Sequence, residues 1–233
     1  MLLDRELRGS LQFFLDYTNL TPDSPGFGLT ADSTKRPSVA SIAAVGFALT
    51  AWVIACERGF LPAAEARAIV RGTLRTLCNA AAHHRGFFAH FLHMENGERF
   101  RKCEYSTIDT ALCLNGVITA AAYFDQDAEV ADLAQQLLER VDWHFIVFTR
   151  GDRTLFRMAY NPDRGGGLSE RSCVRSAPAS SSWAMTWGFW SGCSSPRRVA
   201  WASRRSSCRT ASSPCGQCPR RPCRSHGAWP ALR

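Results

Sequence analysis

Lysine is almost absent from this 233-residue chain, which contains 26 Arg but only two Lys, Lys35 and Lys102. From residue 168 onward the chain also lacks Lys, Asp, Asn, Ile and Tyr, and Glu170 is the only carboxylate there. The same segment holds 11 Arg, 15 Ser, 6 Cys, 6 Pro and 5 Trp. It has no apolar periodicity of 2 or 3.6, so it predicts neither strands nor helices. Residues 167–233 are called the tail below.

The shortage of acidic residues in the tail accounts for the formal net charge of +8. Residues 168–233 carry a net charge of +10, whereas the first 167 residues carry 17 basic and 19 acidic side chains, or −2. A basic protein ordinarily suggests an anionic partner such as nucleic acid. The body, residues 1–166, is nearly neutral and contributes none of the positive net charge. We therefore expect no specific nucleic-acid partner for the body.

Three interpretations of the tail remain open. Its residue types are those of G/C-rich codons, which favours translation out of frame from a G/C-rich gene. The tail also contains the CxxC pair Cys215 and Cys218, which could chelate a tetrahedral metal together with a second pair of ligands. The other candidate ligands, however, do not have the usual spacing of such a second pair. A basic arm that contacts phosphates through arginine is the third interpretation. The zinc ligands of the second interpretation would be Cys208, Cys215, Cys218, Cys223 and His226.

A secretory signal is also missing from the start of the chain. The first ten residues, MLLDRELRGS, place charges where such a signal has an apolar core. The default expectation is a cytoplasmic protein, with the periplasm or the exterior as the alternative if a signal has been lost. Free cysteines in the body are expected to pack as small apolar residues.

Charged residues are missing from 38–56, and Asp109 is the only one in 106–124. Helices that are apolar all round are either buried or span a membrane. Residues 38–56 are close to the minimum length for a span, but serine, glycine and threonine dilute them, so no membrane segment is expected. Residues 62–78 and 127–142 instead place apolar residues at i, i+3, i+4 and i+7, which predicts amphipathic helices. A shorter amphipathic helix is predicted at 4–16.

The alternation of buried and amphipathic helices predicts an inner and an outer layer of helices. Between them lie two β-prone segments, 87–100 and 145–160. The first contains the turn Glu95-Asn96-Gly97-Glu98, a strong hairpin signal, and the second contains Arg150-Gly151-Asp152. The expected fold class is therefore all-α, with short β-hairpins on one rim. Loops on such a rim are natural positions for a binding site.

Several stretches of the body, taken together, resemble the bacterial glucoamylase-like family. They are FFLDYTNLTPDSPGFGLTADST (13–34), PSVASIAAVGFALTAWVIACERGFL (37–61), RGFFAHFLHMENGERFRKCEYSTIDTAL (85–112) and RVDW (140–143). The resemblance extends from about residue 2 to residue 166. That family includes enzymes that cleave β-1,2-glucans and a domain of the cyclic β-1,2-glucan synthases.

The resemblance implies an (α/α)6 toroid with a sugar-binding cleft at one end. Members continue beyond the MAYNP region (158–162) with further inner and outer helices and with a Trp-Asp and Tyr-x-Glu motif, and nothing after Gly167 matches these. We therefore expect residues 1–166 to form the amino-terminal part of such a domain, a partial toroid, and residues 167–233 to be an irregular tail.

Glycoside hydrolysis requires two carboxyl groups on either side of the glycosidic bond. The candidates here are Asp32, which lies in a glycine-rich loop before the first buried helix, and Glu104 and Asp109, which flank the start of the second. Asp109 has an alternative role, because Ser106 and Asp109 are spaced as a helix capping box. Glu104 lies ahead of the cap, where no capping role requires a carboxylate, so we favour Glu104 as a cleft carboxylate.

The resemblance also suggests substrate contacts. His90 and Glu95 lie in the first predicted hairpin, and Tyr105, Phe27, Phe88 and Trp143 could stack on sugar rings, although each aromatic residue could equally pack in the core or on the rim. We expect no metal here, because His90 and His93 should point to opposite faces of a strand. No cofactor is expected either.

The resulting hypothesis is a glycoside hydrolase-like domain that acts on or binds β-glucan oligosaccharides or polysaccharides, with β-1,2-linked glucan as the implied substrate, and that is incomplete and inactive in this chain. The first alternative is a non-catalytic carbohydrate-binding or scaffold domain. The second is a nucleic-acid-binding protein that acts through its tail. The sequence gives no prediction of the oligomeric state.

Overall fold

The computed structural model describes residues 2–164 and 174–175, and about half of these residues are helical. The α-helices of this part are α1 (Leu2–Tyr17), α2 (Ile42–Glu57), α3 (Ala63–Asn79), α4 (Thr107–Tyr123) and α5 (Ala128–Glu139). Two short 3-10 helices follow, η1 (Trp143–Ile146) and η2 (Pro162–Arg164). Of the tail, only residues 174–175 are described, and they form a short strand where the sequence predicted none. The candidate zinc ligands lie outside the described residues.

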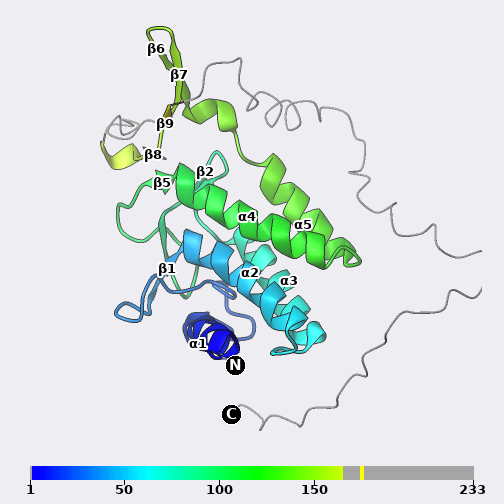
Figure 1. Cartoon of the computed structure of the whole chain (residues 1–233). Helices are drawn as coiled ribbons and strands as arrows, with labels where there is room; N and C mark the ends of the chain where they lie inside the picture. The colour runs from blue at the N-terminus through cyan, green and yellow to red at the C-terminus, as the bar shows by residue number, and fades with distance from the viewer. Residues whose placement is uncertain (1, 165–173, 176–233) are drawn as a thin grey trace, which may run out of the picture. The chain divides into compact units, whose positions relative to one another are not determined.

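Helices α2 and α4 lie side by side, and α3 and α5 form a second pair that packs behind them (Figure 1). The first pair meets at two glycines. A Cβ atom on Gly116 would lie 2.1 Å from the Gly46 carbonyl oxygen, and one on Gly46 would lie 2.4 Å from the Leu112 carbonyl oxygen. Only glycine allows two helix backbones to approach this closely. The contact fixes the two helices whose amino-terminal ends carry the candidate site.

Ion pairs connect the two helices of the second layer. Arg71 of α3 forms ion pairs with Asp127, the N-cap residue of α5, and with Glu129 of α5. From the other end of α5, the Arg140 guanidinium donates hydrogen bonds to the carbonyl oxygens of Leu77 and Cys78 at the end of α3, at 3.0 and 3.1 Å. Orphan carbonyls at a helix end are satisfied in this way.

The helices predicted from apolar periodicity are confirmed, with corrections at their ends. The segment 38–56 begins as a strand, and its helix starts at Ile42. The reason is tertiary, because Val39–Ser41 pairs with a strand about fifty residues later in the sequence. The segment 127–142 leaves the α-helix after Glu139, and the side chain of Asp142 caps η1 instead, accepting from the Phe145 N–H.

Short antiparallel strands gather where α2 and α4 begin and extend toward η1 (Figure 1). Three of the sheets have two strands, β1–β4, β2–β3 and β5–β8, and a fourth has three strands in the order β6–β7–β9. The strands are β1 (Val39–Ser41), β2 (His83–His84), β3 (Phe87–Phe88), β4 (Phe91–His93), β5 (Tyr105–Ser106), β6 (Val147–Arg150), β7 (Arg153–Phe156), β8 (Ala159–Tyr160) and β9 (Val174–Arg175).

The two predicted hairpins differ in outcome. In 145–160 the predicted hairpin is confirmed as β6 and β7 around Gly151, whose φ of 63° suits the turn. Its first strand starts at Val147, because Phe145 and Ile146 belong to η1. In 87–100 only Phe91–His93 folds back on the residues after the turn, with the His93 N–H bonded to the Glu98 carbonyl at 2.8 Å. The start of that segment, β3, pairs with β2 instead, which the turn signal alone does not indicate.

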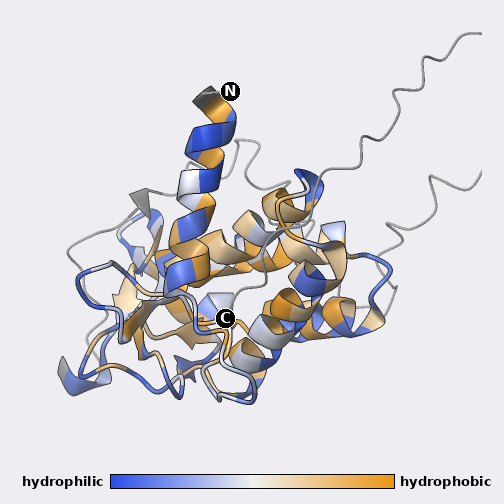
Figure 2. Cartoon of the chain, turned by 90° about the horizontal axis from the view of Figure 1, so that it is seen from below, coloured by the Kyte–Doolittle hydropathy of each residue, from blue (hydrophilic) through white to orange (hydrophobic). Residues whose placement is uncertain are grey.

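The two inner helices are less buried than predicted. Phe47 on α2 and Ile108 on α4 are 54% and 51% exposed, and Ile54 and Ile118 on the same helices are 42% exposed. Helix α1 covers Phe47 and Ile54 only in part, because these two side chains line an open groove together with Leu11 of α1. Helix α1, which projects with hydrophilic and hydrophobic residues alternating along it (Figure 2), packs its Phe14 edge-on against Trp52, with ring centroids 6.3 Å apart. Among the described residues, no helix is both long enough and apolar enough to cross a membrane.

Candidate functional site

The candidate site lies where the amino-terminal ends of α2 and α4 meet strands β1, β4 and β5. His90, between β3 and β4, joins the two helices through its main chain. Its N–H donates to the Glu104 carbonyl oxygen at 2.9 Å, ahead of α4, and its carbonyl oxygen accepts from the Ile42 N–H at 3.1 Å, at the start of α2. The backbone of His90 is therefore held from both sides.

The side chain of His90 lies between two carboxylates. Its Nδ1 is 2.9 Å from Glu104 Oε1, and its Nε2 is 3.6 Å from Asp109 Oδ2. The side chains of His90, Glu104 and Asp109 are 29%, 40% and 15% exposed, so Glu104 is the most accessible of the three. The structure thus brings together three of the residues singled out in the sequence. We call them the carboxylate cluster.

Asp109 also acts at the start of α4. The Ser106 hydroxyl donates to Asp109 Oδ2 at 2.5 Å, and the Asp109 N–H donates to Ser106 Oγ at 3.3 Å. The predicted cap at Ser106 is confirmed, although the carboxylate accepts from the hydroxyl rather than from the main-chain N–H of a standard capping box. The capping role keeps Asp109 in place beside His90, which makes Glu104 the better candidate for a reacting carboxylate.

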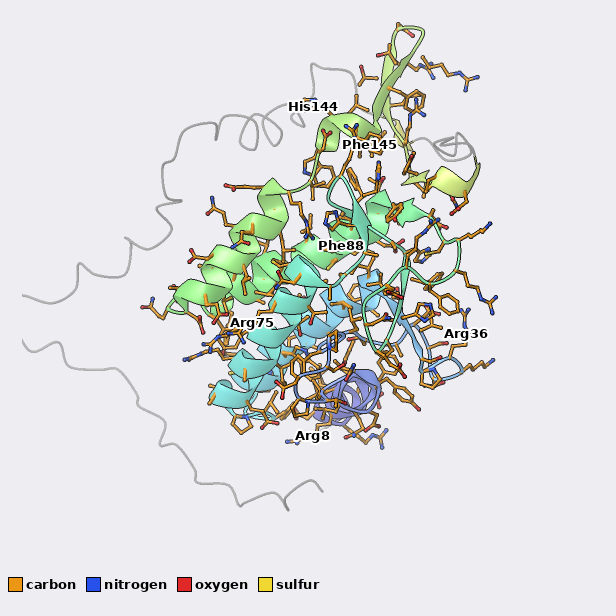
Figure 3. All side chains as sticks on the ribbon, turned by 180° about the vertical axis from the view of Figure 1, so that it is seen from behind. Arg8, Arg36, Arg75, Phe88, His144 and Phe145 are labelled. Atoms are coloured by element: carbon orange, nitrogen blue, oxygen red, sulfur yellow. The ribbon has the colours of Figure 1, made fainter. Side chains whose placement is uncertain are left out.

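Asp32 is linked to the cluster through intermediates. Its carboxylate accepts a hydrogen bond from Arg36 at 3.2 Å and is 29% exposed. The Arg36 guanidinium is 5.8 Å from the centroid of the Phe91 ring, and that ring stacks on His90 with centroids 3.9 Å apart and planes 15° apart. Figure 3 shows Arg36 at the right-hand edge of the view. Sequence reasoning missed Arg36 and Phe91, although Asp32 and Arg36 are four residues apart.

The loop that leads into Glu104 is anchored by a distant residue. Asn161, which is only 8% exposed, donates through Nδ2 to the Lys102 carbonyl oxygen at 3.0 Å and accepts from Arg99 at 3.2 Å. Arg99 in turn pairs with Asp163 at 2.8 Å and donates to the Cys103 carbonyl oxygen at 2.6 Å. The MAYNP segment therefore holds the approach to the carboxylate.

Three of the aromatic residues predicted to contact a sugar pack against other parts of the protein instead. Phe88 is 1% exposed and lies in the core, as Figure 3 shows, so its ring is not accessible to a sugar. Trp143 packs edge-on against Phe87, with centroids 5.5 Å apart. Phe27 packs against Gly72 of α3. For these three residues the packing alternative fits the structure.

Tyr105 and Glu95 keep some accessibility. Tyr105 pairs with Tyr160 across β5–β8, and both rings lie near His84, with centroids 5.7 and 4.5 Å from it. Glu95 is exposed in the turn, and its carbonyl oxygen accepts from the Gly26 N–H at 2.9 Å, which joins the turn to the glycine-rich loop. Contact of either residue with a sugar stays a prediction.

No group of three or more His, Cys, Asp or Glu residues within 2–164 is arranged to hold a metal ion. An apolar groove of about 310 Å³ lies elsewhere, between α1 and α2, and is lined by residues that include Leu11, Phe14 and Phe47. Its lining has the character of incompletely covered core rather than of a polar catalytic site.

Two histidines beside the site predict a dependence of stability on pH. Burial lowers the pKa of His83, with Arg140 as a further cause, and burial followed by Arg85 lowers the pKa of His84. Because both groups are held neutral in the folded state, their contribution to stability is present above about pH 6.5 and is lost as the pH falls below it. Urea unfolding at about pH 7.5 and pH 5.5 should show a lower midpoint at the acid pH.

The matched control is the double variant His83→Gln and His84→Gln, in which the difference between the two midpoints should shrink. Carboxylates titrate mainly below this window, and Arg71 lowers the pKa of Asp127 further still. An undiminished difference in the double variant would contradict the assignment to these two histidines.

Comparison with solved structures shows a shared fold. A candidate glucoamylase from Bacteroides fragilis matches with a TM-score of 0.60 and 19% identity over 74% of this chain and 42% of its own length. A candidate glucoamylase from Bacteroides uniformis matches with a TM-score of 0.59 and 20% identity over 72% of this chain and 41% of its own. The endo-β-1,2-glucanase from Chitinophaga pinensis, in complex with sophorotriose and glucose, matches with a TM-score of 0.57 and 17% identity over 70% and 40%.

No protein-family model matches the chain, and no curated protein sequence does. The chain spans about two fifths of the length of these three solved structures. At such low identity the likeness is one of fold.

Proposed function

We propose that residues 1–166 are the amino-terminal part of a glucoamylase-like (α/α)6 domain that acts on or binds β-glucan oligosaccharides. The observation that carries the proposal is the carboxylate cluster, in which a partly exposed Glu104 is held by His90 at the rim where two inner helices begin. The shared fold with a glucanase crystallised with sophorotriose supports β-1,2-linked glucan as the substrate class.

Glu104 and Asp32 form the proposed reacting pair. Asp109 is engaged by Ser106, the N-cap residue of α4, whereas Glu104 and Asp32 are 40% and 29% exposed and lie in the segments that precede α4 and α2. Glycoside hydrolysis uses one carboxyl group as the acid and the other as the base or the nucleophile. No metal or cofactor is required for this chemistry.

Binding without turnover is the second candidate function. The chain spans about two fifths of its structural relatives, and Phe47 and Ile108 of the inner helices are more than half exposed. A ring that is only partly present can provide one wall of a sugar-binding cleft while lacking groups from the other wall. Under this candidate function, the chain binds glucan and releases no shorter product.

The test uses the full chain and sophorotriose, with cellotriose and maltotriose for comparison. Binding is measured by calorimetric titration and hydrolysis by chromatography of the products. We expect preferential binding of sophorotriose. If the chain also hydrolyses it, Glu104→Gln and Asp32→Asn should each lower the rate by about 10²-fold or more while sparing much of the binding.

The matched control is Asp132→Asn, which neutralises an exposed carboxylate on α5, away from the candidate site. This variant should behave as the unaltered chain. Binding that survives in all variants without any hydrolysis supports the second candidate function. A folded chain that binds none of the three sugars would overturn both.

A further inference from the structure

The two ring nitrogens of His90 have unequal partners. Nδ1 lies 2.9 Å from Glu104 Oε1, which is the distance of a charge-assisted hydrogen bond, whereas Nε2 lies 3.6 Å from Asp109 Oδ2, beyond hydrogen-bonding distance. An ionised carboxylate can only accept a hydrogen bond. The short contact therefore places a proton on Nδ1 whenever Glu104 is ionised.

The ring of His90 is also restrained in orientation. Phe91 stacks on it with planes 15° apart, and the main chain of His90 is bonded to Glu104 on one side and to Ile42 on the other. Turning the ring over would direct a carbon atom at Glu104 and lose the short contact. His90 thus holds Glu104 twice, because its main-chain N–H donates to the Glu104 carbonyl oxygen and its ring contacts the Glu104 carboxylate.

The surroundings of Nε2 favour the same arrangement. The facing oxygen, Asp109 Oδ2, already accepts the Ser106 hydroxyl at 2.5 Å. That oxygen is held by the cap of α4 and does not approach Nε2 closely. Glu104 is consequently the partner that selects the proton position on the ring.

We propose that His90 is a positioning residue that holds the Glu104 carboxylate in place through a fixed Nδ1–H tautomer. The inference deepens the proposed function, on which its catalytic meaning rests. A histidine fixed in one tautomer orients the group that it contacts, so the carboxylate presents a constant direction to a bound sugar. The reacting group is Glu104, and His90 acts through it.

The first test reads the tautomer directly and needs no activity. Long-range ¹H–¹⁵N NMR of the labelled full chain at about pH 8.5, some two units above the ordinary histidine pKa, shows which ring nitrogen carries the proton. We expect the Nδ1–H form for His90. His144, which is exposed on η1, serves as the internal reference for a histidine in water (Figure 3). In Glu104→Ala, the His90 signal should move to that of the reference.

A predominantly Nε2–H ring, or a ring that matches His144 in the unaltered chain, overturns the proposal. This result is independent of sugar chemistry, so it can fail while the proposed function stands, and the reverse also holds.

The second test separates the two nitrogens by substitution. The amide nitrogen of Asn can occupy the position of Nδ1, and that of Gln reaches the position of Nε2. His90→Asn should therefore retain most of the hydrolysis rate of the unaltered chain, while His90→Gln should lose about tenfold or more of that rate, and both variants should keep much of the sophorotriose affinity. A purely structural role would affect both variants according to their stability, which urea unfolding measures in parallel. Equal losses at equal stability, or better function in His90→Gln, would count against the proposal.

Discussion

Replacing Gly116 with Ala is expected to destabilise the chain by about 2–3 kcal/mol, even though Ala is the better helix former. The added Cβ atom would lie 2.1 Å from the Gly46 carbonyl oxygen and 2.7 Å from the Gly46 carbonyl carbon. Both are main-chain atoms, so no side-chain rotation relieves the overlap and α2 must move away from α4. Urea unfolding followed by circular dichroism measures the change.

The control substitution has the opposite sign. Gly9 lies in α1, and a Cβ atom there would meet nothing within 4 Å. Gly9→Ala should therefore stabilise the chain by about 0.5–1 kcal/mol, the ordinary helix preference for Ala over Gly. If Gly116→Ala were as stable as Gly9→Ala, the close approach of α2 and α4 would be wrong.

The second large effect is expected at Trp52. Its side chain is fully buried at the centre of the core and meets Phe14 of α1 edge-on. Trp52→Ala should cost about 3–5 kcal/mol, because it removes a large apolar surface and leaves a cavity between α1 and α2. The same unfolding measurement applies, and a variant too unstable to fold would show no cooperative transition.

Phe47 gives the matched comparison on the same helix. It is 54% exposed, so Phe47→Ala should cost about 1 kcal/mol or less. A cost similar to that of Trp52→Ala would mean that Phe47 is covered in solution by another molecule. Light scattering, which measures the molecular mass in solution, would then show whether the unaltered chain self-associates through Phe47 and whether the variant does not.

The helices could be predicted from the sequence because their signals are local. In 62–78 and 127–142 the apolar spacing alone defines the buried face, and the Ser106 cap marks where α4 begins. The strand at Val39–Ser41 could not be predicted, because its partner, Phe91–His93, is distant in sequence and supplies the hydrogen bonds that replace a helical turn.

The three residues of the carboxylate cluster could be singled out from the sequence, but the contacts between them, and the neighbouring Arg36 and Phe91, could not. The expected strand includes His93 but not His90, which precedes β4; His90 contacts Glu104, and the exposed His93 lies beside Phe100. The bridging position of His90 depends on three chain segments meeting, which spacing does not encode. For Phe88, neighbouring aromatic residues signal burial and rim stacking equally well, and only the fold decides between them.

The bonds of Asn161 to the loop before Glu104 bear on the order in which the site is assembled during protein synthesis. Lys102 and Asn161 are 59 positions apart, and both α4 and α5 lie between them. The loop thus emerges from the ribosome well before the residue that anchors it. We expect the helices to pack first and the carboxylate loop to settle only when Asn161 has been added. A nascent chain stalled just short of that residue would carry the acidic side chains without their final geometry.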